Sequence, residues 1–231
     1  MIKGLIAEIG NNHFGSLKKA KEMIKAAHEY GADYVKLQAI DPEIVNGSMP
    51  REFYRHVALT YQEYLELKDY GDYIGTTVFF SCFGMFIVGR LHKISGSQYR
   101  TFEPVVLKVH NNEDTIISIP ADVSDLETKS AAISKMSPMY VSQYLENDVD
   151  LSWIDKYSSI LNKQVGYSDH TIGIETCTKA IRNNGARLIE KHFHLGSPIK
   201  WEGQLFRDSI HSCSPGELAK IKECLDAMPN L

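Results

Sequence analysis

The chain has 231 residues, of which 43% are hydrophobic and 23% charged, and its formal net charge at pH 7 is −4. This length suits one α/β barrel or one doubly wound domain, and the composition predicts a packed globular core. The small negative charge, with no block of Lys and Arg, argues against a nucleic acid or an anionic membrane as partner.

The cysteines and the amino terminus indicate the compartment. The four cysteines have no CxxC spacing, and they are Cys82, Cys177, Cys213 and Cys224. This usage predicts a reducing, cytoplasmic setting. The opening "MIKGLIAEIG" is interrupted by Glu8 too early for a signal peptide, and no apolar run approaches the roughly 20 residues of a membrane helix.

The first part of the chain predicts a strand followed by a helix. The run "LIAEIG" at 5–10 is typical of a strand, and the apolar spacing over 16–32 is typical of an amphipathic helix. Ser16 is the expected N-cap and Gly31 the expected residue after the helix end. The apolar stripe of this helix consists of Leu17, Ala20, Ile24 and Ala27.

The same strand-and-helix unit recurs to the end of the chain. Further strands are predicted at 33–38, 76–83, 91–95, 114–120, 138–144, 163–169 and 186–193, and further helices at 61–73, 174–184 and 215–228. Eight strands with intervening helices predict an α/β fold, a single-domain (β/α)8 TIM barrel over residues 1–231. A doubly wound sheet is the runner-up, but "GNNHFGS" is not the Gly-rich phosphate turn that usually follows its first strand.

Polar residues gather where the predicted strands end, which is where barrels place their active sites. They are Glu8, Asn12, His13, Lys36, Gln38, Ser81, Lys93, Ser95, Ser118, Ser142, Gln143, Tyr144, Ser168, Asp169, His170, Glu190, Lys191, His192 and His194. A closed barrel would direct many of these side chains into one small volume.

Two of these groups predict specific chemistry. His170 and His192 end neighbouring strands about 4.8 Å apart, so both imidazoles can reach one divalent metal, with Asp208 as an added oxygen ligand or a substrate contact. Lysines and serine hydroxyls together suit a phosphate. A single histidine or serine at a strand end is more often structural, whereas a lysine inside an apolar strand, such as Lys36, is expensive unless it is paired.

Several motifs resemble the sialic acid synthase (N-acetylneuraminate synthase) family. They are "IAEIGNNHFGSLKKAKEMIKAAHEYGADYVKLQ" at 6–38, "VGYSDHTIGIE" at 165–175, "GARLIEKHF" at 185–193 and "SPGELAKIKE" at 214–223, with weaker matches at "FFSCFG" and "MYVSQY". The similarity covers nearly the whole chain, and the first, seventh and eighth strand motifs are specific when taken together.

The resemblance implies a carbohydrate-biosynthesis transferase that forms a carbon–carbon bond. It would condense phosphoenolpyruvate (PEP) with an N-acylated amino sugar, N-acetylmannosamine or a relative, to a nonulosonic acid and release phosphate. By motif position, the metal ligands are His170 and His192, and the metal is Mn2+, with Mg2+, Co2+ or Zn2+ as alternatives. The expected PEP contacts are Lys36, Lys93, Ser118, Ser142 and Ser168, and the sugar contacts are Gln38, Tyr144 and Asp208. Ser95 is a further expected substrate contact, and Glu8 is the acidic residue near the metal-bound water.

The chain also departs from the family pattern. The antifreeze-like domain that usually follows the barrel is expected to be absent, and the ends of strands four to six are altered, so the metal and PEP side is better preserved than the sugar side. Because members of the family form dimers, a homodimer stays an open alternative for this chain. Two alternatives stay open beside the main hypothesis: a 2-keto-3-deoxy acid synthase for another aldose or aldose phosphate, and a degenerate member that binds a ligand or partner without turnover.

Overall fold

The eight predicted strands are all present in the computed structural model. It describes residues 2–43, 45, 49–83, 92–95, 115–123, 126–131, 133–142, 148–196 and 198–229, with 92–95 and 129 described as backbone. The strands are β1 (Gly4–Gly10), β2 (Tyr34–Ile40), β3 (Thr77–Phe83), β4 (His92–Ser95), β5 (Thr115–Ile119), β6 (Ser137–Val141), β7 (Gly166–Asp169) and β8 (Leu188–His192).

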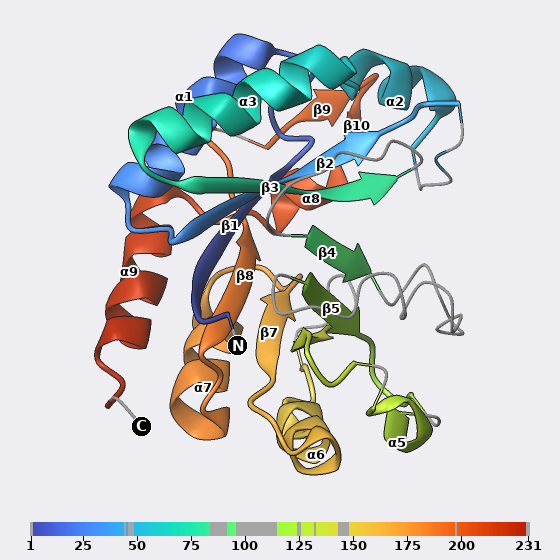
Figure 1. Ribbon diagram of the computed structural model, residues 1–231. Coiled ribbons are helices and arrows are strands. Elements are labelled where there is room, and N and C mark those ends of the chain that lie inside the picture. The colour runs from blue at the N-terminus through green and yellow to red at the C-terminus, as the bar shows by residue number, and fades with distance from the viewer. Residues whose placement is uncertain are drawn as a thin grey trace.

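The strands form a closed parallel sheet in chain order. Each strand pairs in parallel with the next, and β8 pairs in parallel with β1, so the order closes on itself. The predicted TIM-barrel-like α/β architecture is therefore confirmed, and the doubly wound alternative is wrong because an open sheet has two edges. Figure 1 shows helices around the outside of the strands, with α1 (Leu17–Glu29) beside α3 (Tyr61–Ile74).

The first helix forms as its sequence predicts. The Ser16 hydroxyl accepts a hydrogen bond from the Lys19 amide at 3.2 Å, which satisfies one of the free amides of the first turn. Ala20, Ile24 and Ala27 are fully buried against the sheet. Gly31 follows the helix end at φ +94°, in the left-handed region that favours glycine.

Some elements were not predicted. They are the helices α2 (Arg51–Val57), α5 (Leu126–Lys129), α6 (Ser152–Leu161) and α8 (Arg207–Ile210), and a hairpin of β9 (Lys200–Trp201) and β10 (Gln204–Leu205). The predicted helices α7 (Glu175–Asn184) and α9 (Pro215–Asp226) are confirmed, and a capping box between Ser214 and Glu217 starts α9.

The barrel interior has an apolar layer toward the amino ends of the strands and a polar layer toward their carboxyl ends. Toward the amino ends of the strands a small apolar cluster fills the interior, made of Ile6, Phe79, Ile116, Met139 and Leu188. A second, larger apolar cluster packs the outer face of the sheet against the helices. Because side chains alternate between the two faces of a strand, the next inward positions above the apolar layer begin the polar one.

The described part of the chain has no disulfide and no membrane-crossing helix. All four cysteines are free thiols. Among the described helices, none combines the length and the apolar composition that a bilayer crossing needs.

Candidate active site

The centre of the polar layer is a buried lysine between two carboxylates. Lys36 on β2 is 4% exposed, and its ammonium contacts Glu8 on β1 and lies 2.9 Å from Oε2 of Glu190 on β8. The closure of the barrel produces this cluster, because β1 pairs with both β2 and β8. The expectation that a lysine in this apolar strand is paired is confirmed.

Hydrogen bonds hold both carboxylates in place. The Ser168 hydroxyl on β7 donates to Oε1 of Glu190 at 2.7 Å, and the Gly10 amide donates to Oε1 of Glu8 at 2.7 Å. The described side chains of this cluster thus bring two carboxylates to one ammonium, a set of groups that can bind a cation or exchange a proton.

The two predicted histidines meet at the carboxyl ends of β7 and β8. The ring centroids of His170 and His192 are 5.2 Å apart, and His192 Nδ1 is buried without a hydrogen-bond partner in the described structure. Burial, followed by the nearby His170, holds the pKa of His192 well below its usual value, so its imidazole is neutral and able to act as a ligand. A third ring, that of His211, is fully buried with its centroid 6.5 Å from that of His170.

Gly10 lies next to both Asp208 and His192, which places Asp208 close to the histidine pair. Gly10 follows a β-bulge at φ +53°, and a Cβ placed on it would lie 3.5 Å from His192 Cε1 and 3.6 Å from Asp208 Oδ2. Asp208 is 7% exposed, and burial raises the pKa of its carboxyl to about 6. The predicted sugar contact therefore lies on the histidine side of the interior.

Two of the predicted serine contacts differ in their surroundings. Ser118 on β5 is 2% exposed, and its hydroxyl has no partner among the described residues, so it is available to a ligand. The Ser142 hydroxyl is instead engaged, because Tyr167 Oη lies 3.0 Å away and the His170 amide donates to it at 3.3 Å. The structure thus gives Ser142 a contact with the protein backbone that the sequence did not predict.

The other predicted residues lie at the rim or beyond the described side chains. Gln38 on β2 accepts a hydrogen bond from Asn11 at 2.6 Å. The backbone register of β4 places Lys93 beside Ser81 and Ser95 beside Ser118. Tyr144 lies outside the described residues.

Sequence reasoning missed the role of Glu190. It was one of many polar strand-end residues, yet it contacts both Lys36 and Ser168. The signal was its position two residues before His192 on the same strand, which places both side chains on the same face. His211 carried no comparable signal, because it follows the short helix α8 rather than a strand.

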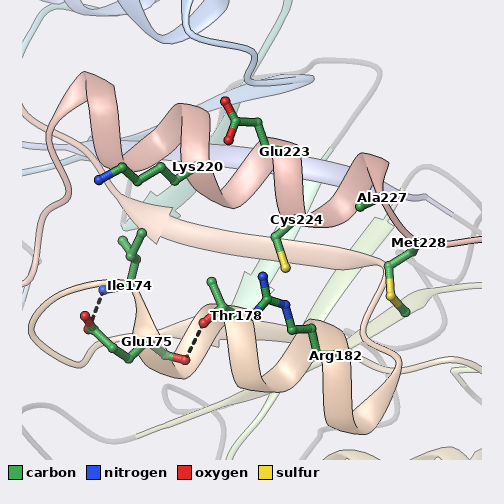
Figure 2. Close-up of a pocket in the computed structure, with 9 residues that line it drawn as sticks. All are labelled: Ile174, Glu175, Thr178, Arg182, Lys220, Glu223, Cys224, Ala227 and Met228. Carbon is green, nitrogen blue, oxygen red and sulfur yellow. Dashed lines mark hydrogen bonds between the residues drawn. The ribbon is translucent and has the colours of Figure 1, made fainter.

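A separate groove lies on the outside of the barrel between α7 and α9. Figure 2 shows its lining, with Lys220 and Ile174 at one end of the groove and Arg182, Cys224 and Met228 toward the other. Its lining includes none of the predicted site residues. The convergent polar chemistry of the described residues therefore belongs to the barrel interior and not to this groove.

Comparison with known proteins decides the family. The family model described as the NeuB family matches residues 23–229. This chain belongs to the NeuB family. The prediction from the strand motifs is thereby confirmed.

The NeuB relatives include named synthases. The human N-acetylneuraminate-9-phosphate synthase is 29% identical, over 94% of this chain and 67% of the human protein. The N,N'-diacetyllegionaminic acid synthase of Legionella pneumophila is 28% identical, over 96% of this chain and 70% of that protein. An uncharacterized protein of Methanocaldococcus jannaschii is 31% identical, over 83% of this chain. This chain spans about two thirds of the length of such relatives, from 62% to 70%.

A solved NeuB-type structure has the same fold. The N-acetylneuraminic acid synthetase of Leptospira borgpetersenii, crystallised in complex with citrate, superimposes with a TM-score of 0.80 at 25% identity. The superposition covers 98% of this chain and 83% of that one. A truncated 3-deoxy-D-arabino-heptulosonate 7-phosphate synthase of Thermotoga maritima shares the fold at 14% identity, with a TM-score of 0.68 over 96% of this chain.

Proposed function

We propose that this NeuB-family chain is a cytoplasmic, PEP-dependent synthase built on a complete (β/α)8 barrel. It would join PEP to an N-acylated amino sugar such as N-acetylmannosamine, forming a nonulosonic acid and releasing phosphate. The observation that carries the proposal is the buried cluster of Lys36, Glu8 and Glu190, which shares the barrel interior with the His170–His192 pair.

The histidine pair fits a divalent metal, Mn2+ in this proposal. The rings are close enough for two nitrogens to bind one ion, His192 Nδ1 is buried without a partner among the described residues, and the neighbouring cluster contains two carboxylates. Among the described residues no set of three or more His, Cys, Asp and Glu side chains forms a full metal site, so substrate or water would complete the coordination. When bound, the ion would act as a Lewis acid toward the sugar aldehyde.

The chain's own residues would bind and orient PEP. Lys36 supplies a positive charge, and Ser118 supplies a buried hydroxyl without a partner in the described structure. Both suit the phosphate or carboxylate of PEP. Lys93 remains a proposed phosphate contact and Ser95 a proposed substrate contact, because β4 lies beside β3 and β5. Holding C3 of PEP against the aldehyde carbon is the main catalytic effect expected from this arrangement.

The carboxylates would handle the proton. C3 of PEP bonds to the aldehyde carbon, water adds at C2, and the C2–O bond to phosphate then breaks to leave a ketone. The added water loses both of its protons on the way to the ketone oxygen: one goes to the departing phosphate, and the other goes to the aldehyde oxygen. Glu8 and Glu190 are the buried bases that lie in reach of the same lysine, so they are suited to accept and return that proton. Gln38 and Asp208 would bind the sugar at the rim, together with Tyr144.

The deciding experiment measures phosphate release from PEP with Mn2+ across a panel of aldoses that includes N-acetylmannosamine. We expect release with an N-acylated amino sugar, and a loss of at least about 100-fold in the His170→Ala and His192→Ala variants. His28→Ala is the matched control, because His28 is an exposed histidine on the outer helix α1. No release with any sugar, from folded and Mn2+-loaded protein, would contradict the proposal.

A further inference from the structure

The outer faces of β7 and β8 carry a second buried ion pair. Lys191 Nζ lies 3.2 Å from Oδ2 of Asp169, and the two residues are 0% and 1% exposed. They are direct register partners, Asp169 on β7 and Lys191 on β8. Because neighbouring residues on a strand point to opposite faces, this pair lies on the helix side of the sheet, behind Ser168 and Glu190.

The pair lies around His170, the residue that follows β7. Lys191 Nζ donates to the Thr171 carbonyl at 2.6 Å, and Asp169 Oδ1 accepts from the Thr171 amide at 2.7 Å. Of the two residues that flank His170 in the chain, Asp169 therefore belongs to the ion pair and Thr171 is bound to both of its members. Lys191 is itself the residue before His192, so one pair is adjacent in sequence to both histidines.

Further hydrogen bonds extend this network to His170 itself. Tyr167 Oη lies 3.3 Å from Asp169 Oδ1 and 3.0 Å from the Ser142 hydroxyl, which accepts from the His170 amide at 3.3 Å. The Cys177 thiol on α7 donates to Asp169 Oδ2 at 3.0 Å. The segment around His170 is thus held by groups from three places: Ser142 just after β6, Lys191 on β8 and Cys177 on α7.

Stability alone does not account for this arrangement. A buried ion pair can usually be replaced by neutral residues of similar size without loss of stability, because desolvation offsets much of the attraction between the charges. What the pair supplies is a fixed backbone geometry, since a charged pair with hydrogen-bonded neighbours has few alternative arrangements. The geometry that it fixes is that of the two strand ends bearing His170 and His192.

We propose that Asp169 and Lys191 are positioning residues, which hold the His170 turn and the end of β8 so that the two imidazoles stay together. The proposal rests on the proposed function in its metal-binding aspect. In this proposal the ion pair does not touch the substrate. It acts by holding the backbone on which His170 and His192 lie.

The test compares two neutralised pairs. The double variant Asp169→Asn with Lys191→Met removes both charges together, so no unpaired buried charge remains. The control is Asp33→Asn with Lys222→Met. It neutralises another ion pair, with Nζ–Oδ1 3.1 Å, at the opposite end of the barrel, where Asp33 accepts from the Leu5 amide. Hydrogen–deuterium exchange of the metal-free proteins and Mn2+ affinity by titration calorimetry are measured for both variants and the wild type.

We expect faster exchange over residues 166–174 in the first variant alone, together with Mn2+ affinity weakened by about 10- to 100-fold, as for outer partners of metal ligands. Melting temperatures show that both variants are folded. Wild-type exchange over 166–174, or wild-type Mn2+ affinity in the first variant, would overturn the positioning role. If the wild type itself binds no Mn2+, the metal part of the proposed function fails, and exchange over 166–174 still decides the positioning role.

Discussion

The buried lysines Lys36 and Lys191 lie on strands of the same barrel, but their side chains point to opposite faces of the sheet. Lys36 points into the barrel, where it contacts Glu8 and Glu190. Lys191 points to the helix layer, where it contacts Asp169 and the Thr171 carbonyl. Both side chains are almost completely buried, at 5% and 0% exposure.

The difference lies in the carboxylates around each lysine. Lys191 is paired one to one with Asp169, on the helix side of the sheet. Lys36 is shared between two carboxylates, in the interior that the strand ends open onto. A one-to-one buried pair is suited to fix structure, and a lysine among several titratable groups is suited to a binding site, which is the role proposed for Lys36. Burial alone does not distinguish the two lysines.

The largest effect is expected from Lys36→Met. Loss of the ammonium that contacts both carboxylates should lower kcat/KM for phosphate release by about 1,000-fold, as expected for a charge aimed at the reacting groups. The assay is run below the melting temperature of the variant, because unpaired Glu8 and Glu190 also reduce stability. Lys25→Met, an exposed lysine on α1, is the control. Activity within tenfold of wild type would contradict the role of Lys36.

Lys191→Met alone should destabilise the fold by about 3–5 kcal/mol, because it leaves the Asp169 carboxylate buried without its charge partner. Urea unfolding measures the free energy. Adding Asp169→Asn to this variant should recover at least half of the loss, since the unpaired charge is then gone. Equal stability of the single and double variants would mean that the two residues are not coupled.

A pH effect is expected from His13, in the turn between β1 and α1. Burial, followed by the charge of Lys19, lowers the pKa of His13 to about 4. The unfolded state, with a pKa near 6.5, binds the proton first, so stability is full above pH 6.5 and falls as the pH drops toward 4. The loss reaches about 3 kcal/mol at pH 4.

The His13→Asn variant isolates this contribution. Asn keeps an acceptor for the Gly15 amide, which donates to His13 Nδ1 at 3.2 Å, but it does not titrate. Urea unfolding at pH 7 and pH 4 should show a smaller pH loss in the variant by about 3 kcal/mol. Parallel pH curves for the two proteins would show that His13 is not protonated on unfolding.

The smallest effect is expected from Gly10→Ala, which should cost about 1 kcal/mol of stability, since φ is +53°. Gly75→Ala has the same kind of strain, at φ +87°, but a Cβ there would meet nothing within 4 Å. The melting temperature of both variants should be a few degrees below that of the wild type. Only Gly10→Ala, whose Cβ would contact His192 and Asp208, should lose activity. Equal activity in the two variants would remove Gly10 from the site.

The strands could be predicted because their signal is local. Runs such as "DYVKLQ" and "ARLIEKHF" carry the apolar pattern within a few residues, and the structure confirms both as strands. The helix α6 was missed although Trp153, Ile154 and Tyr157 follow helical spacing, because no side chain caps its start and Asn162 ends it in place of glycine. A helix with a regular apolar pattern is therefore hard to predict when the residues at its two ends do not mark where it starts and stops.

The site could be predicted only in part. Strand position sufficed for His170, His192 and Lys36, because every strand of a closed parallel sheet ends at the same mouth. The contact between Lys36 and Glu190 depends on how β8 pairs with β1, across more than 150 residues of chain, and no local pattern encodes that register. The use of the Ser142 hydroxyl by the His170 amide is a similar case.

The apolar layer of Ile6, Phe79, Ile116, Met139 and Leu188 fills the barrel interior toward the amino ends of the strands. Under the proposed function, PEP would bind at Lys36, and the sugar would bind at Gln38, two residues further toward the carboxyl end of β2. The sugar would then lie above PEP, so initial-rate kinetics should show ordered addition with PEP first.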